Sequence, residues 1–155
     1  MTTGEGPSAS PSDRFRPGEV VTTPSRTVSV SDIEGFAHLT GDENPIHLDD
    51  AFAARQLFGG RVAHGLLTLS VTLGLWYRAG LFNEWIVVFL GIDKLRFLRP
   101  VRPGESLTSQ LKIVHREPSA RGDRVELENT TFNGTGEPVL TFSARLLLSP
   151  PNRPA

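Results

Sequence analysis

The second half of the chain alternates hydrophobic and polar residues with a period of two. This alternation runs through residues 107–113, 125–128 and 140–148, and a further apolar segment spans residues 85–97. Such a pattern is typical of strands in a sheet that has one covered face. Turn-forming pairs separate the segments, at Pro103-Gly104, Gly122-Asp123 and Asn133-Gly134. The pattern therefore predicts a largely antiparallel sheet.

Residues 62–78 follow a different pattern, because their apolar side chains surround the helix axis instead of forming one stripe. A helix that is apolar on nearly all sides is expected to be buried. Gly65 and Gly74 lower the helix propensity but allow a close approach of neighbouring backbone. The segment is 17 residues long, which is shorter than the roughly 20 apolar residues of a membrane span. One buried helix embraced by an antiparallel sheet predicts an α+β fold.

The segment before this helix predicts one strand and two short helices. Residues 20–30 are rich in β-branched side chains and predict the strand. Ser31 and Glu34 match a capping box, which predicts a helix that begins at Ser31 and ends at Gly41. Residues 49–55 predict the second helix. Four side chains of the first helix are expected to face the core: Ile33, Phe36, Ala37 and Leu39.

Composition indicates a single domain and argues against several kinds of binding site. A length of 155 residues suits one domain. Residues 18–149 should form it, between disordered tails at 1–17 and 150–155 that are rich in proline and small polar residues. A net charge of −1 gives no support for binding to nucleic acid or to a membrane, and the absence of cysteine excludes disulfides and thiolate sites. With no signal-peptide pattern, a soluble cytoplasmic protein is expected.

One loop carries most of the candidate chemistry: Thr40-Gly41-Asp42-Glu43-Asn44-Pro45-Ile46-His47. It places Asp42 and His47 five residues apart, around Pro45, which is expected to forbid a regular helix between them. A carboxylate and an imidazole held in this way can point into one cavity and act as an acid/base pair. Each residue alone has an ordinary interpretation as a turn residue or a solvated side chain. The combination is harder to explain in that way, since a turn does not need both the Asp and the His.

Residues 36–47 resemble the signature of the (R)-specific enoyl-CoA hydratases, the MaoC-like dehydratases. The resemblance continues at Ala53 and at Val62-Ala63-His64-Gly65, which is similar to the start of that family's central helix. Further matches follow at Gly91-Ile92-Asp93, Arg96-Phe97, Pro100-Val101 and Pro103-Gly104-Glu105. The resemblance implies a single hot-dog domain, in which a bent antiparallel sheet wraps around one long central helix. It also implies a homodimer, which agrees with the need to cover a free sheet edge.

The resemblance further implies roles for individual residues. Asp42 and His47 would share one water, and would interconvert trans-2-enoyl and 3-hydroxyacyl thioesters by adding or removing it. The backbone N–H of Gly65, near the N-terminus of the helix, would stabilise the thioester oxygen. Asn44 would hold the loop in place and orient the water. His64 would be a supporting residue that packs or hydrogen-bonds beside the site.

The substrate is expected to be a thioester of CoA or of an acyl-carrier protein, and no other cofactor is expected. Its acyl tail should run along the central helix, whose first turns offer Ala63, Leu66, Leu67 and Ser70. Trp76 and Tyr77 would close the far end, which favours short to medium chains. The phosphates of the carrier could meet one of several basic residues, although a solvated surface role is the more ordinary one for each: Arg61, Lys94, Arg96, Arg99 and Arg121.

Other chemistries have less support in the sequence. The four histidines are scattered without supporting spacing, so no metal site is expected. The chain contains neither a Gly-x-Ser-x-Gly elbow nor a Gly-rich nucleotide motif. Two alternatives within the same fold remain open. One is a hot-dog acyl thioesterase, which would more often use a carboxylate without this Asp/His register. The other is a non-catalytic protein that binds acyl thioesters, in which one member of the pair would tend to be lost.

Overall fold

The computed structural model describes residues 15–82 and 85–149, and its centre is a curved antiparallel sheet. The strands are β1 (Val20–Thr22), β2 (Arg26–Thr27), β3 (Ile86–Phe97), β4 (Ser106–Ser119), β5 (Gly122–Phe132) and β6 (Pro138–Ser149). They lie in the order β1-β4-β5-β6-β3, and β2 pairs with β4 beside this path. Neighbouring strands pair in the antiparallel direction. The sheet predicted from the alternating segments is therefore confirmed.

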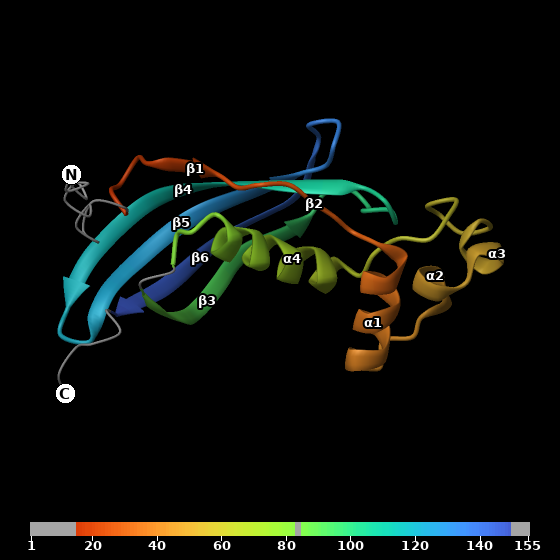
Figure 1. Ribbon diagram of the computed structural model, residues 1–155, viewed down its shortest axis with the longest axis horizontal. Coiled ribbons are helices and arrows are strands. Elements are labelled where there is room, and N and C mark those ends of the chain that lie inside the picture. The colour runs from red at the N-terminus through yellow and green to blue at the C-terminus, as the bar shows by residue number, and fades with distance from the viewer. Residues whose placement is uncertain (1–14, 83–84, 150–155) are drawn as a thin grey trace, which may run out of the picture.

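The long helix α4 (Gly65–Arg78) lies along the concave face of this sheet (Figure 1). Its inward side buries Leu67, Val71 and Leu75 against apolar residues of β4, β5 and β6. Full burial of one such side chain is worth about 1.5–3 kcal/mol, so this contact is the main source of stability that the helix has. A bent sheet around one helix is the hot-dog arrangement, and the α+β prediction is confirmed.

A row of buried polar side chains, here called the polar seam, crosses the apolar core between α4 and the sheet. It consists of Thr72 and Trp76 on α4 and of Ser109, Asn129 and Thr131 on β4 and β5. The hydroxyls of Thr72 and Thr131 are 2.9 Å apart, and the Trp76 Nε1–H donates to Asn129 Oδ1 at 2.9 Å. A buried polar group that loses its partner costs about 1–3 kcal/mol. The polar seam therefore fixes the position of α4 along the sheet.

Three short helices stand beyond one end of the sheet (Figure 1). They are α1 (Val30–Thr40), α2 (Pro45–Leu48) and α3 (Asp50–Ala53). Together with the residues that join them they form a unit, here called the cap, which contains the whole motif loop. The cap meets the rest of the chain near the N-terminus of α4, so the motif loop is brought to the start of the central helix.

The cap begins with a capping box on Ser29, not on Ser31 as predicted. The Ser29 Oγ accepts the Asp32 N–H at 3.0 Å, and Asp32 Oδ2 accepts the Ser29 N–H at 2.8 Å. Burial by itself raises the pKa of Asp32, but the hydrogen bonds from Ser29 and the charge of Arg26 outweigh it and lower that pKa below its usual value. The N-cap therefore lies two residues earlier than predicted, because Asp32 has two cooperating partners, Ser29 and Arg26.

Several other predicted boundaries differ from the structure. Phe15, which was assigned to the N-terminal tail, is 1% exposed and its ring stacks on that of Phe82. The predicted strand at 20–30 is divided into β1 and β2. Leu39, which was expected in the core, is 83% exposed. Of the tails predicted at 1–17 and 150–155, residues 1–14 and 150–155 lie outside the described residues.

The central helix is also less buried than predicted. It begins at Gly65 instead of residue 62, and Leu66 and Tyr77 are 57% and 65% exposed. The sheet covers the inward side of the helix alone, so the prediction of burial on all sides is wrong for the single chain. Within the described ranges, no helix combines the length and the apolar content that a membrane crossing requires.

Candidate active site

His47 is held in one orientation by the short helix α2. Asn44 caps this helix, because its Oδ1 accepts the N–H of Ile46 at 3.2 Å, and Pro45 is the first helical residue. The proline therefore starts a helical turn that carries His47, where the sequence predicted that it would forbid one. The His47 Nδ1 lies 2.7 Å from the carbonyl oxygen of Val62. A carbonyl can only accept, so Nδ1 carries the hydrogen and Nε2 is left with a free lone pair.

Asp42 lies in the exposed linker between α1 and α2. The helix α1 ends at Gly41, whose φ of 78° is readily adopted by glycine, and the chain then turns toward the start of α4. One carboxylate oxygen of Asp42 and one ring nitrogen of each of His47 and His64 lie within 4.8 Å of one another. The structure thus brings together the two residues that the motif paired, and adds His64 to them.

His64 is buried between these residues, with 3% of its surface exposed. Its Nε2–H donates to the backbone carbonyl of Asp42 at 2.9 Å. Its ring stacks on that of His47 with 3.7 Å between centroids and 27° between the ring planes, and Phe36 covers it at 5.0 Å. His64 therefore packs and forms a hydrogen bond beside Asp42 and His47, as the sequence led us to expect.

Gly65 is the first residue of α4 and follows His64 directly. The first N–H groups of a helix have no intrahelical acceptor, and the helix dipole makes this end partly positive. Among the described residues no acceptor is found for the Gly65 N–H. A Cβ at this position would lie 2.9 Å from the Phe97 ring, so a side chain cannot be added there without movement. The N–H is thus an available donor in a place that only glycine fits closely.

Two adjoining cavities meet at this point. The smaller one, of about 170 Å³, is lined by Asp42 and His64 among others, and the larger one, of about 470 Å³, by Thr68 and mostly apolar side chains. Both are lined by His47, Gly65 and Leu66. The apolar walls of the larger cavity come from distant parts of the chain: Ile46, Phe58, Val62, Ala63, Phe97, Leu98, Pro100, Val101 and Val139. A polar chamber next to an apolar one suits a substrate with a reactive head and an apolar tail.

The larger cavity does not follow the path predicted for the acyl tail. Ala63 and Leu66 line it, as predicted, but Leu67 and Ser70 line a separate cavity on α4. Trp76 is 1% exposed within the polar seam, and Tyr77 is on the surface. Neither lines the cavity, so the prediction that they close its far end is wrong. The walls at Phe97 and Val139 were not singled out for this role, because they approach α4 only once the sheet has formed.

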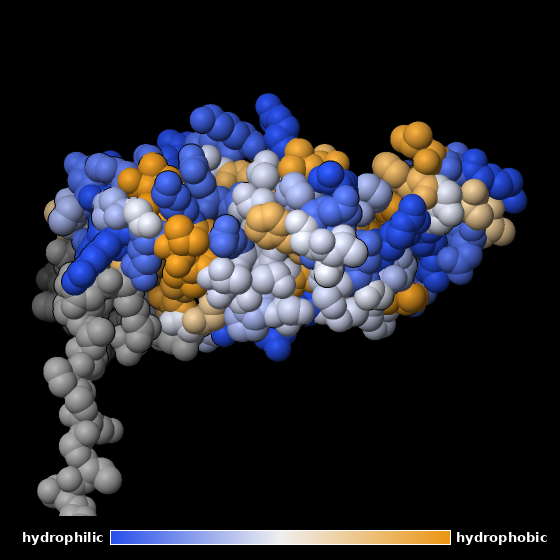
Figure 2. Space-filling view, turned by 90° about the horizontal axis from the view of Figure 1, so that it is seen from above, coloured by the Kyte–Doolittle hydropathy of each residue, from blue (hydrophilic) through white to orange (hydrophobic). Residues whose placement is uncertain are grey.

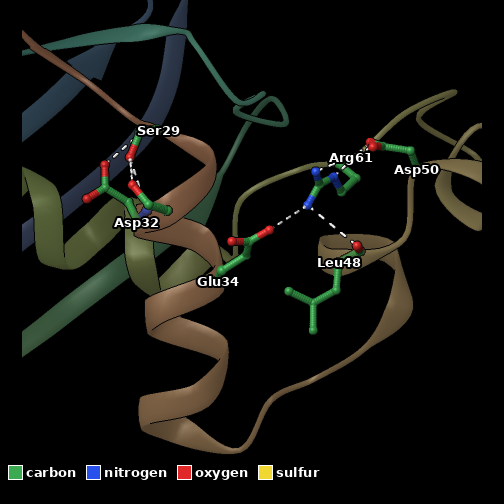
Figure 3. A network of polar contacts seen from close by, with 7 residues as sticks. Ser29, Asp32, Glu34, Leu48, Asp50 and Arg61 are labelled. Atoms are coloured by element: carbon green, nitrogen blue, oxygen red, sulfur yellow. Dashed lines mark hydrogen bonds and ion pairs between the residues drawn. The ribbon is translucent and has the colours of Figure 1, made fainter.

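Arg61 ties the cap together next to the site (Figure 3). Its guanidinium lies 2.8 Å from Asp50 and 3.5 Å from Glu34, and it also donates to the carbonyl of Leu48. The hydrogen bonds to Asp50 raise the pKa of Arg61 above its usual value, against the opposite effect of burial. Because Arg61 is engaged in this way, it is a poor candidate for the phosphates of a carrier. Of the basic residues considered, Arg99 is the one that lines the larger cavity.

The meeting of Asp42, His47 and His64 also raises the question of a metal ion, since such groups bind zinc. The structure contradicts the premise that the histidines are scattered. However, the lone pair of an imidazole nitrogen lies in the ring plane, and stacked rings direct their lone pairs side by side instead of toward one point. The arrangement therefore favours proton chemistry over metal binding, and the absence of a metal stays a prediction.

Comparison with known proteins gives matches over most of the chain. A family model described as a MaoC like domain matches residues 14–134. Protein MaoC of Klebsiella aerogenes is 38% identical over 112 residues, which are 70% of this chain and 33% of that protein. The 3-hydroxybutyryl-CoA dehydratase of Methylorubrum extorquens is 36% identical over 108 residues, which are 64% of this chain and 62% of that protein. The chain thus spans less than two thirds of the length of either relative.

A solved structure supports the same grouping. The (R)-hydratase of Aeromonas caviae involved in PHA biosynthesis has a TM-score of 0.74 and 27% identity, over 86% of this chain and 97% of that one. The likeness therefore extends over most of both chains.

Proposed function

The chain belongs to the MaoC-like domain family, which confirms the resemblance seen in its sequence, and on this premise we propose that it is a hydro-lyase acting on acyl thioesters. The reaction is the addition of water to a trans-2-enoyl thioester, and its reverse from an (R)-3-hydroxyacyl thioester. The observation that carries the proposal is the hydrogen bond from His47 Nδ1 to the Val62 carbonyl. It leaves Nε2 as the ring nitrogen that is free to accept a proton, on a residue that lines both cavities and that has a ring nitrogen within 4.8 Å of groups on Asp42 and His64.

The two acceptors explain how one water is activated. A water between the Asp42 carboxylate and His47 Nε2 can donate one hydrogen to each, so that a lone pair of its oxygen faces C3 of the substrate. As the C3–O bond forms, one of the pair takes the water's proton. The electrons of the C2–C3 double bond move toward the thioester oxygen, and the protonated member of the pair then delivers the water's proton to C2, which returns the pair to its starting state. Dehydration follows the same steps in reverse.

The Gly65 N–H supplies the hydrogen-bond donor that the thioester oxygen requires. Negative charge develops on the thioester oxygen, and a preformed donor at a helix N-terminus stabilises it. Gly65 lines both cavities, so an acyl head beside Asp42 and His47 has its carbonyl near this donor. The apolar walls of the larger cavity suit the acyl tail. The thioester carrier is CoA or an acyl-carrier protein.

We also propose that two copies of the chain form a homodimer. The strand β3 lies at the edge of the sheet, and apolar residues stay exposed on β3 and α4: Leu66, Tyr77, Val88, Phe89, Leu90, Phe97 and Leu98. Pairing of the β3 edges would extend the sheet and cover these residues. Figure 2 shows the molecule from above relative to Figure 1, where hydrophobic patches lie among mostly polar residues. Light scattering should give twice the 16.9 kDa of one chain, and a mass near 16.9 kDa would contradict the dimer.

The activity is tested with crotonyl-CoA. Hydration removes the enoyl-thioester absorbance without releasing free thiol, whereas release of thiol would indicate a thioesterase, and binding without change would indicate a non-catalytic protein. Asp42→Asn and His47→Ala should each lower the rate by about 10²–10⁴-fold. Glu43→Gln is the matched control, because Glu43 is an exposed carboxylate in the same loop whose side chain pairs with that of His38. Retention of more than a tenth of the activity in both site variants would contradict the assignment.

A further inference from the structure

We propose that His64 is the positioning residue of this site, which holds Asp42, His47 and Gly65 in the one arrangement in which they act together. The inference rests on the proposed function and adds a residue to it. His64 does not have to touch the substrate for this role. It acts through three neighbours, each of which it controls by a different kind of contact.

The first contact fixes the position of the Asp42 backbone. The His64 Nε2–H donates to the Asp42 carbonyl at 2.9 Å. Asp42 lies in a linker of exposed residues, and the other hydrogen bond to its backbone, from its N–H to Thr40 Oγ1, is longer at 3.3 Å. A donor on a buried ring is a firmer anchor than an exposed hydroxyl, because the ring itself cannot move. His64 therefore ties the carboxylate's backbone to the start of α4.

The second contact fixes the plane of His47. The bond from His47 Nδ1 to Val62 restrains rotation within the ring plane but leaves the ring free to tilt. The stacked ring of His64, at 3.7 Å between centroids, closes off that tilt. The third contact is covalent, since Gly65 follows His64 in the chain. His64 also accepts the Thr68 N–H through its carbonyl, so the first turn of α4 that carries the Gly65 N–H is built on it.

The remaining ring nitrogen argues against a purely structural role. The Nδ1 of His64 is buried and has no hydrogen-bond partner among the described residues. A buried polar atom without a partner destabilises the fold. A phenyl ring would fill the same space between His47 and Phe36 without this cost. The histidine is thus the worse choice for packing and the better one for the Nε2–H bond to Asp42.

The test compares side chains that differ in reach. The amide nitrogen of glutamine can occupy the place of Nε2, whereas that of asparagine reaches only the place of Nδ1. His64→Asn should therefore lose the bond to Asp42 and lower kcat by about 10²-fold, as expected for a misplacement of about 1 Å. KM should change by less than about threefold. His64→Gln should restore kcat at least about tenfold over His64→Asn. His38→Asn and His38→Gln are matched controls at an exposed histidine, and should leave kcat unchanged.

His64→Phe is a second test variant, which is measured in case His64→Asn does not fold. It should keep the melting temperature of the wild type, or raise it, while kcat falls by about 10²-fold. The proposal is overturned if His64→Asn or His64→Phe retains more than a tenth of kcat. It is also overturned if asparagine and glutamine lose kcat equally and in step with melting temperature.

A readout without substrate separates this proposal from the proposed function. In ¹H–¹⁵N spectra of the wild type at neutral pH, His64 should carry hydrogen on Nε2, and His64→Asn should shift the signals of Asp42 and His47. An Nδ1–H tautomer would overturn the positioning role even in an active enzyme. Absence of hydration by a wild type that gives the expected spectra would instead overturn the proposed function.

Discussion

The contact between Gly65 and Phe97 allows the helix N-terminus to be tested by one methyl group. In Gly65→Ala the new Cβ would lie 2.9, 3.0 and 3.1 Å from three atoms of the Phe97 ring, whereas ordinary contact begins at 3.4 Å. The ring or the helix must therefore move by about 0.5 Å, which is 3.4 − 2.9. Phe97 pairs with Leu140 in the sheet, so its backbone is held and much of the movement falls on its ring and on α4.

The expected effect on catalysis follows from this displacement. If a misplacement of about 1 Å costs about 10²-fold, half of it costs about tenfold in kcat/KM, which is about 1.4 kcal/mol of transition-state stabilisation. Stability should change little, because alanine is favoured over glycine in a helix by up to about 1 kcal/mol and so offsets part of the clash. Hydration of crotonyl-CoA and thermal unfolding of the same samples measure the two effects.

A second substitution shows whether the loss is steric. Phe97→Leu removes the ring atoms that a Cβ at Gly65 would meet, so Gly65→Ala/Phe97→Leu should recover most of the activity that Gly65→Ala loses. Because Phe97 also lines the larger cavity, Phe97→Leu alone is measured as the reference from which the effect of the added methyl group in the double variant is calculated. Equal activity of Gly65→Ala and wild type would refute the reasoning, and so would a double variant as poor as the product of the two single losses.

Three further predictions concern stability and are checked by urea unfolding. Asp32→Asn should destabilise the protein by about 1 kcal/mol at pH 7. Because the folded-state pKa of Asp32 is lowered, this stabilisation is present above the unfolded pKa of about 3.9 and is lost as the pH falls through the folded value, so the difference from wild type should vanish in acid. Trp76→Phe should cost about 1–3 kcal/mol, because Asn129 loses the Nε1–H donor. Arg61→Met should cost less, up to about 1 kcal/mol, since the Asp50 and Glu34 carboxylates that lose their shared cation are largely exposed to water, and a gain in stability would contradict this.

The strands and the pairing of Asp42 with His47 could be predicted because each depends on short-range pattern. Alternation over a few residues defines a strand, and a fixed loop keeps two side chains on one side. The start of α1 was misplaced because Ser29 and Ser31 each stand three residues before an acidic residue, and only the guanidinium of Arg26 distinguishes them.

Features that depend on distant segments could not be predicted. Arg61 was considered for the phosphates of a carrier and Val139 for no role, because the contacts that define their positions span the cap or the whole sheet. The exposure of Leu66 has a related cause, because apolarity around a helix does not say whether the same chain covers each side. Phe15 was overlooked since one aromatic residue does not change the composition of a polar segment.

Because the cap lies beyond the sheet, the site lies at a junction between two units that are held in place by different contacts. The cap carries Asp42 and His47, while Gly65 belongs to α4, which the polar seam holds on the sheet. On the proposed function, a thioester that contacts all three would bridge the junction, and part of its binding energy would go into holding the cap against α4. We therefore expect substrate to act as a temporary structural element, so that amide hydrogen exchange slows on α1 and α2 when it binds, while the sheet keeps its rates.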